Sequence, residues 1–241
     1  MSNLTNYVPH WCMMDGNTDK EWGCGWRSLQ TLLSQIGIFN DVWTLAFELR
    51  AFTGDPDIVF DYDRGEISMA DLSQISPYFV NIAINNGYTN ANFDMLMINN
   101  LEALNNITSK LNAYYNNEGN TKILGLFGTG GNVACIAGYQ KMDDKDMIYL
   151  IDPHGDSPEM NFENCDGIGR GGQGWVDLKE SVLFGNHIFK KTDNDFLEFN
   201  PAIIVLFNNF NVETENVETE DVETENVETE NVETENVEIN Y

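Results

Sequence analysis

The sequence predicts an α+β domain, because helical patterns occupy its first half and short strand-like runs its second half. In the first half, apolar residues recur three and four positions apart, as on one face of a helix. After Gly119 the pattern changes to short apolar runs bounded by glycine, aspartate and proline, which is typical of strands. Helices first and strands later favour an α+β domain over a doubly wound α/β fold.

Three helices are predicted. The clearest covers residues 26–36, and Gly37 follows it as a stop signal. A second helix is expected to start at a capping box of Ser68 and Asp71 and to run to about residue 86, with a kink or a break at Pro77. A third covers residues 101–116. The apolar faces of the first and third helices comprise Trp26, Leu29, Leu32, Leu33 and Ile36, and Leu101, Leu104, Ile107 and Leu111.

Four strands are predicted, over residues 122–127, 133–139, 147–151 and 202–207. The Gly-Thr-Gly-Gly stretch at 128–131 separates two of them and is expected to form a tight connection, since it lacks the Gly-Lys-Ser/Thr of a phosphate-binding loop. Residues 169–174 match GxGxxG by letter. Without a strand before them and a helix after them they predict a close-approach loop, not a nucleotide site.

The chain ends in repeats of Val-Glu-Thr-Glu-Asn or Val-Glu-Thr-Glu-Asp. Their period of five matches neither a helix nor a strand, and crowded glutamates repel one another. We therefore expect one folded domain over residues 1–208 and a disordered acidic tail over 209–241. The tail is either a solvated extension or an acidic interaction segment.

The net charge of −27 disfavours nucleic acid and anionic membranes as partners. Residues 211–241 hold 12 of the 39 acidic residues and no basic one, so 27 acidic residues face 12 basic ones in 1–210, a net charge of −15. No segment is apolar enough for a signal peptide or a membrane span. The four cysteines form neither a CxxC pair nor a metal-ligand spacing, so we expect free thiols in the cytosol or nucleus, and neither metal nor cofactor.

Cys24 lies immediately before the clearest predicted helix, between Gly23 and Gly25. Unpaired N–H groups and the positive end of the helix dipole favour a thiolate at such a position. The two glycines are expected to leave room for a substrate backbone. A small buried hydrophobic residue is the alternative, because free cysteines most often have that role.

Asp152, Pro153 and His154 end the strand predicted over residues 147–151. In an extended chain, residues two apart point to the same side, so the carboxylate could reach the imidazole. Proline favours this extended geometry at and before its own position. Cys24, His154 and Asp152 together match the nucleophile, base and orienting carboxylate of a cysteine protease. The alternative for this tripeptide is a turn with an incidental surface histidine.

Trp-Gly-Cys-Gly-Trp-Arg-Ser-Leu-Gln-Thr at 22–31, combined with Asp-Pro-His at 152–154, closely resembles the UfSP family, the cysteine proteases specific for the ubiquitin-fold modifier. The resemblance covers roughly residues 7–207. It implies a papain-like fold and cleavage after the C-terminal glycine of the modifier, both to mature its precursor and to remove it from lysines. It assigns Cys24 as nucleophile, His154 as base and Asp152 as orienter.

The implied partners are the modifier and its protein conjugates, bound by a monomer that an adaptor could bring to membranes. A deubiquitinase and an autophagy-type cysteine protease are the alternative enzymes. The autophagy-type enzymes also combine Gly-Cys with Asp-Pro-His, but they lack the Gly-Trp-Arg-Ser-Leu-Gln run.

The sequence departs from the family at one position. The family usually has a tyrosine about twelve residues before the cysteine, whose hydroxyl helps to stabilise the oxyanion, where this chain has Trp11 and Cys12. We assign Trp11 as the replacement donor, through its indole N–H. This departure keeps open a catalytically weak homologue that only binds the modifier. His187 is expected to be a structural histidine, with a catalytic role only if His154 has none.

Overall fold

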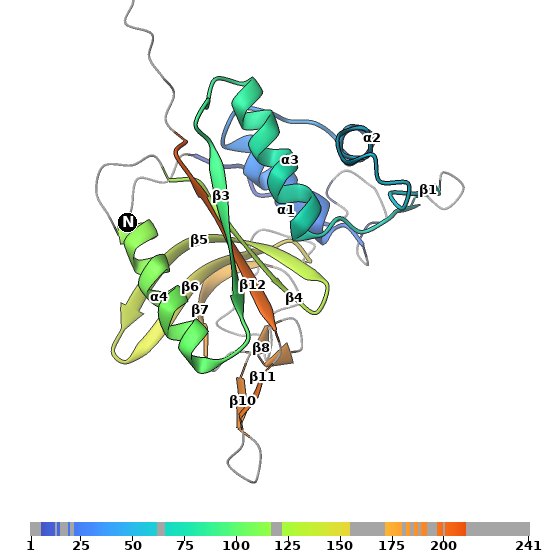
Figure 1. Ribbon diagram of the computed structural model, residues 1–241. Helices are drawn as coiled ribbons and strands as arrows, with labels where there is room; N and C mark the ends of the chain where they lie inside the picture. The colour runs from blue at the N-terminus through green and yellow to red at the C-terminus, as the bar shows by residue number, and fades with distance from the viewer. Residues whose placement is uncertain are drawn as a thin grey trace, which may run out of the picture.

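The computed structural model describes residues 6–12, 14, 19, 22–61, 66–116, 122–154, 172–179, 182–183, 186–187, 189–191, 197–199 and 201–210. Over these residues the chain has the predicted α+β fold, with helices packed on an antiparallel sheet (Figure 1). The repeats from residue 211 onward and Cys165 lie outside the described residues. The disordered tail therefore stays a prediction.

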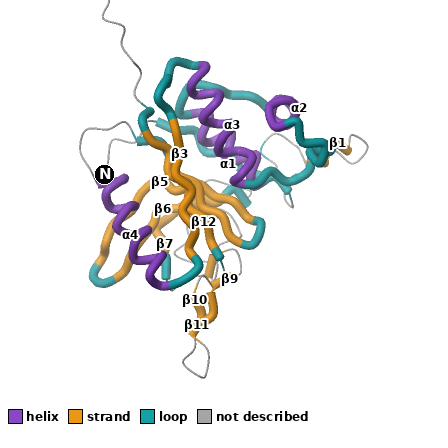
Figure 2. Tube along the Cα trace, in the orientation of Figure 1, coloured by secondary structure: helices purple, strands orange, loops and turns teal. Residues whose placement is uncertain are grey.

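Six of the described strands form one antiparallel sheet, in the order β3-β12-β4-β5-β6-β7 (Figure 2). The four predicted strands correspond to β4, β5, β6 and β12, and β3 and β7 were not predicted. β3 was missed because it is an edge strand whose faces are both partly exposed. The bounds are β3 Asn92–Ile98, β4 Gly125–Thr129, β5 Asn132–Met142, β6 Lys145–Asp152, β7 Gly172–Asp177 and β12 Ala202–Asn208.

Helices cover both faces of this sheet. The bounds are α1 Cys24–Ser34, α2 Val42–Thr53, α3 Leu72–Asn85 and α4 Leu101–Asn116. Neighbouring strand residues point to opposite faces, so each face has its own hydrophobic core. Leu126 of β4 packs in the core that α1, α2 and α3 share, whereas Phe127 packs in the core under α4.

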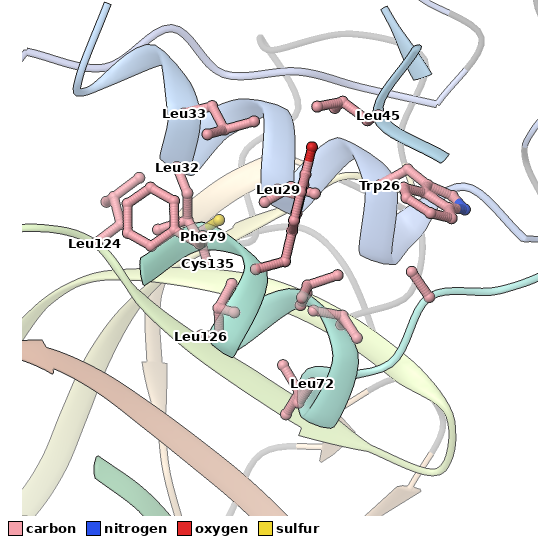
Figure 3. Packing of buried hydrophobic residues seen from close by; sticks show 14 of the residues in the cluster. Trp26, Leu29, Leu32, Leu33, Leu45, Leu72, Phe79, Leu124, Leu126 and Cys135 are labelled. Carbon is pink, nitrogen blue, oxygen red and sulfur yellow. The ribbon is translucent and has the colours of Figure 1, made fainter. Parts of the chain in front are cut away.

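Helix α1 lies at the centre of the larger core, and all of its residues are buried. Figure 3 shows Leu29 and Leu32 of α1 in one cluster with Phe79 of α3 and the strand residues Leu126 and Cys135. The helix ends before Gly37, which has a φ of 78°. The stop signal predicted at this glycine is confirmed.

Helix α3 differs from its prediction in two ways. Its N-cap is Asp71, whose carboxylate accepts hydrogen bonds from the N–H groups of Ser73 and Gln74, so the capping box begins three residues later than predicted. Pro77 also does not divide the helix. A proline removes only one backbone hydrogen bond, and the buried residues on both sides of it, among them Ile75 and Phe79, hold the helix together.

Helix α2 was not predicted from the sequence. It begins at Asp41, whose side chain accepts a hydrogen bond from Thr44 N–H, and it ends at Gly54 with a φ of 66°. Phe47 and Phe52 are exposed on it, which obscures its apolar face. No helix within the described ranges is long and apolar enough to span a membrane.

Glycines close the hairpin between β4 and β5. Gly130 and Gly131 have φ values of 57° and 84°, as a two-residue type I′ turn requires. The predicted tight connection at this stretch is confirmed.

The remaining described strands form three short antiparallel pairs: β1 Phe60–Asp61 with β2 Glu66–Ile67, β8 Val182–Leu183 with β9 Asn186–His187, and β10 Phe189–Lys191 with β11 Leu197–Phe199.

The larger core extends to Phe210, two residues past the predicted end of the domain at 208. Phe210 is 1% exposed and stacks on Phe79 of α3 at a ring separation of 5.4 Å. The folded chain therefore reaches at least residue 210.

Candidate active site

Cys24 is the first residue of α1 and is 5% exposed. The N-cap residue Gly23 has no side chain that could accept hydrogen bonds from the first turn. The N–H groups of that turn and the helix dipole both favour negative charge at this end of the helix. The position predicted for Cys24, at a helix N-terminus, is confirmed.

The glycines on either side of Cys24 make room for the protein's own backbone. A Cβ at Gly23 would lie 2.6 Å from the Asp19 carbonyl oxygen, and a Cβ at Gly25 would lie 2.1 Å from that of Ala70. Real Cβ atoms do not approach other atoms so closely. The expectation that both glycines leave room for a substrate backbone is therefore wrong, because Asp19 and Ala70 fill that space.

Asp152 and His154 interact through a turn. Strand β6 ends at Asp152, and Pro153 and His154 follow as turn residues. The Asp152 carboxylate Oδ1 accepts a hydrogen bond from the His154 backbone N–H at 3.1 Å and lies 2.5 Å from its ring Nδ1. The predicted contact is present, but the extended tripeptide was wrong, because the carboxylate bonds the N–H two residues on and so bends the chain.

Strand β5 connects the helix to this turn. The Ser28 hydroxyl of α1 donates to the Val133 carbonyl at 3.4 Å, and the Cys135 thiol donates to the Ser28 carbonyl at 3.5 Å. Cys135 pairs with Ile151 of β6, the residue before Asp152. The first half of α1 therefore packs on the part of β5 that pairs with the end of β6.

The pKa of His154 reflects its two neighbours. Burial lowers this pKa, but the hydrogen bond and charge of Asp152, together with a hydrogen bond to Cys24 and its charge, raise it to about 10. A protonated imidazole is thus favoured beside the Asp152 carboxylate. Cys24, His154 and Asp152, which are distant in the sequence, meet at one site.

Residues 8–12 run along α1 toward the same turn. The Val8 N–H donates to Ser34 Oγ at 2.8 Å, the His10 N–H to Thr31 Oγ1 at 3.0 Å, and the Cys12 N–H to the Pro153 carbonyl at 2.8 Å. This segment thereby brings both Trp11 and Cys12, the two candidates for the family tyrosine, beside the Asp-Pro-His turn.

Trp11 is 4% exposed and belongs to the hydrophobic core that also contains Cys24. Its assignment as oxyanion donor stays a prediction. The Cys12 thiol has a pKa of about 12, raised first by burial and then by the charges of Asp19 and Cys24. Burial also raises the pKa of Cys135 to about 12. Both thiols are therefore protonated and unreactive at neutral pH.

Two other sequence motifs lie in strands. Gly172 and Gly174 of the GxGxxG match belong to β7, and residues 169–171 lie outside the described residues. The motif therefore runs into a strand instead of opening a helix, which agrees with the rejection of a nucleotide site. His187 belongs to β9, and its side chain lies outside the described part of the structure, so its structural role stays a prediction.

The sequence analysis missed a buried ion pair beside Cys24. Asp19 Oδ2 lies 2.5 Å from Arg27 Nε, and the two side chains are 0% and 1% exposed. One signal could have indicated it. Arg27 lies within the apolar helix predicted over 26–36, and a charged side chain buried in a core needs a partner of opposite charge.

The described residues also line an open pocket of about 370 Å³ between the start of α3 and the sheet. Its lining is mostly apolar and includes Leu72, Met95, Met97, Val133 and Ile203. Among the described residues, no three His, Cys, Asp or Glu side chains gather in a way that could hold a metal ion.

Neither a protein-family model nor a curated protein sequence matches this chain. A solved structure does match it: the crystal structure of UfSP from C. elegans superposes with a TM-score of 0.51 and 18% sequence identity. The match covers 87% of this chain and 34% of the C. elegans chain, so this chain spans about a third of that protein. The chain therefore has the fold of C. elegans UfSP.

Proposed function

We propose that this protein is a cysteine protease that cleaves after the C-terminal glycine of the ubiquitin-fold modifier. The observation that carries the proposal is the meeting of Cys24, at the N-terminus of α1, with His154, which Asp152 holds by its ring nitrogen. This combination supplies a nucleophile, a proton carrier and an orienting carboxylate.

In the proposed reaction, the Cys24 thiolate attacks the carbonyl carbon of the scissile bond. The first-turn N–H groups of α1 stabilise the resulting oxyanion. His154 gives its proton to the leaving amine as the carbon–nitrogen bond breaks, which leaves a thioester on Cys24. His154 then takes a proton from a water molecule that attacks the thioester, and hydrolysis releases the carboxylate and regenerates the thiolate.

Asp152 has a defined part in these steps. Because Asp152 binds Nδ1 of His154, Nε2 is the nitrogen left to exchange the proton with Cys24 and the substrate. The carboxylate also stabilises the protonated imidazolium of His154 before it gives its proton to the leaving amine.

The narrow surroundings of Cys24 support a substrate with small residues next to the scissile bond. Cys24 is 5% exposed, and the backbones of Asp19 and Ala70 pack against the glycines on either side of it. A peptide that ends in glycine carries no side chain at the bond to be cleaved. The acidic domain, with a net charge of −15 over 1–210, also favours a basic partner over an acidic one.

The resemblance to the UfSP family is the reason to propose the ubiquitin-fold modifier as the substrate. It is also the reason to propose both maturation of the precursor and removal of the modifier from lysines. We propose a cytosolic monomer, with recruitment to membranes left to an adaptor. A catalytically weak homologue that only binds the modifier is the second candidate, and the specific observation behind it is that Trp11 and Cys12 stand where the family has a tyrosine.

A panel of electrophilic probes tests the proposal. Ubiquitin-fold modifier, ubiquitin and an autophagy-type modifier would each carry a C-terminal electrophile and be incubated with wild type and with Cys24→Ala. We expect covalent capture of the first probe by wild type alone. Capture of ubiquitin or of the autophagy-type probe instead would assign the alternative enzymes, and binding without capture would support the weak homologue.

A further inference from the structure

We propose that the buried ion pair of Asp19 and Arg27 is a positioning device that fixes the direction of the Cys24 thiol and of its backbone N–H. The inference rests on the proposed function, since it assigns a task to residues that touch no substrate. Neither residue belongs to the three that carry the proposed chemistry, and the sequence analysis assigned neither a role.

Asp19 holds the turn before Cys24 through its backbone. Its carbonyl accepts hydrogen bonds from the N–H groups of Trp22 at 3.2 Å and Gly23 at 2.6 Å. The Gly23 carbonyl in turn accepts from the Arg27 N–H at 2.9 Å, which is the first hydrogen bond of α1. The N–H group of Trp22 and both the N–H group and the carbonyl of Gly23 are therefore held by hydrogen bonds.

The side chain of Asp19 holds the first turn after Cys24. Its Oδ2 pairs with Arg27 Nε, while Arg27 Nη1 donates to Gln30 Oε1 at 3.0 Å. Gln30 then donates to the Asn40 carbonyl at 2.8 Å, just before α2. One residue thus connects the turn before Cys24 with the helix after it, and this network extends to the start of the next helix.

The packing of Gly23 leaves this arrangement little freedom. A Cβ at Gly23 would lie 2.6 Å from both the carbonyl oxygen and Oδ2 of Asp19. Asp19 therefore occupies the space beside the nucleophile with its backbone and its carboxylate together. A shift of Asp19 would let residues 22–24 rotate, and the thiol would move with them.

Stability alone is a weak reason for such a pair. Removing two charges from water offsets most of their attraction, and an apolar pair of similar size often serves the core equally well. A planar guanidinium bound to a carboxylate fixes direction as well as distance, which an apolar pair does not. That property matters next to a nucleophile, because small misplacements of reacting groups slow a reaction strongly.

The test uses the full chain with Asp19→Asn, Arg27→Lys and the double variant Asp19→Leu/Arg27→Met. For each protein, the alkylation rate of Cys24 by iodoacetamide is followed by mass spectrometry of the Cys24 peptide across pH, and the melting temperature is recorded. Steady-state kinetics on a modifier–fluorophore substrate give kcat and KM. Lys179→Met, which breaks the Lys179–Asp146 ion pair at 3.0 Å, is the matched control.

We expect Asp19→Asn and Arg27→Lys to lower kcat and Cys24 alkylation about 10- to 100-fold, with KM within about twofold of wild type. The apolar double variant should regain much of the melting temperature but not the lost rate. The control should leave kcat unchanged. If the double variant recovers rate along with stability, or if the rate falls only by the unfolded fraction, the pair is merely structural and the proposal is overturned.

Alkylation needs no substrate, so this test remains valid if the proposed function is wrong. Wild-type protein that captures no modifier probe would refute the function. The effect of Asp19→Asn on Cys24 alkylation would still support or overturn the positioning role.

Discussion

At the scale of single residues, the candidate site consists of three side chains that two sequence motifs contain, and a turn takes the place of the extended tripeptide that the sequence predicted. Cys24 lies at the end of a buried helix and His154 follows the last residue of β6 by two positions. The Asp152 carboxylate bonds both the backbone and the ring of His154. The following three predictions concern these residues and their neighbour Trp11.

Cys24→Ala should abolish cleavage while the protein stays folded, because the motif at 22–31 contains no second cysteine. His154→Ala should be nearly as damaging. Asp152→Asn should lower kcat by roughly 100-fold or more, since it favours the wrong tautomer of His154. Steady-state kinetics and melting curves check all three. A larger loss of activity for His187→Ala than for His154→Ala would show that the wrong histidine was assigned.

Folding stability should depend on pH through His154. The pKa of His154 is raised from 6.5 to about 10, so the folded protein keeps a proton that the unfolded chain has lost. The stabilisation of the folded protein by this proton on His154 is fully present below pH 6.5 and is lost as the pH rises to about 10. Urea denaturation of wild type and His154→Ala should therefore give free energies of unfolding that converge between pH 6.5 and 9.

The Cys12 thiol, whose ordinary pKa is 9.0 and whose pKa here is about 12, affects stability only above that window. A gap between wild type and His154→Ala that stays constant or widens from pH 6.5 to 9 would contradict the raised pKa of His154.

Trp11→Phe removes the indole N–H but keeps an aromatic ring. If that N–H helps to hold the oxyanion, kcat and kcat/KM should fall together by about 100- to 1000-fold with little change in KM. Trp11→Tyr should keep or raise kcat, and Cys12→Tyr tests the alternative alignment. Wild-type rates for Trp11→Phe would leave Trp11 as a packing residue in the core it shares with Cys24.

At the scale of elements, the start of α1 packs very closely against two segments, one containing Asp19 and the other Ala70. Glycine is normally a weak helix former, and replacing it by alanine inside a helix stabilises by about 1 kcal/mol. The backbone of Ala70 reverses that expectation at Gly25, because a Cβ would lie 2.1 Å from its carbonyl oxygen.

Gly25→Ala should therefore destabilise the protein by about 1–3 kcal/mol and lower kcat, since α1 must move away from residue 70 and carry Cys24 with it. Gly37→Ala is the control. It also costs about 1–2 kcal/mol, through its φ of 78°, but nothing lies within 4 Å of the added Cβ, so kcat should be unchanged. Equal kcat for the two variants would mean that the packing on Ala70 does not position Cys24.

At the scale of the whole molecule, the described residues form one six-stranded sheet with a core on each face, beside three short strand pairs, and the larger core reaches Phe210. Many of the acidic residues of the chain lie after Phe210, outside the described core. Residues 211–241 carry 12 acidic residues and no basic one, and their valines, five apart, share no helical or strand face.

Removing residues 211–241 should leave the melting temperature and kcat nearly unchanged. Phe210→Ala should instead destabilise by about 3–5 kcal/mol, because it empties a site in the core against Phe79 and Tyr88. Calorimetry of the truncated chain and of the point variant compares the two. A cooperative loss of folding on truncation would refute the prediction of a tail without a packing face.

The sequence determined the features that depend on local chemistry. The periodicity of 26–36 predicted α1, the apolar runs predicted β4, β5, β6 and β12, and two short motifs led to the proposal of Cys24, Asp152 and His154 as the site. Prediction from the sequence failed where the hydrophobic pattern was weak or where segments distant in the chain fixed the structure. The exposed phenylalanines obscured α2, and β3 lacked a clean alternation.

Only the tertiary structure decided how the site is held. The contacts of Gly23 with Asp19 and of Gly25 with Ala70, and the ion pair of Asp19 and Arg27, are set by where segments meet after folding. A sequence pattern reports which residues prefer a helix, a strand or the core, because those preferences act over a few neighbouring positions. It does not report which backbone fills the space beside a glycine, because that depends on the packing of segments that are distant in the chain.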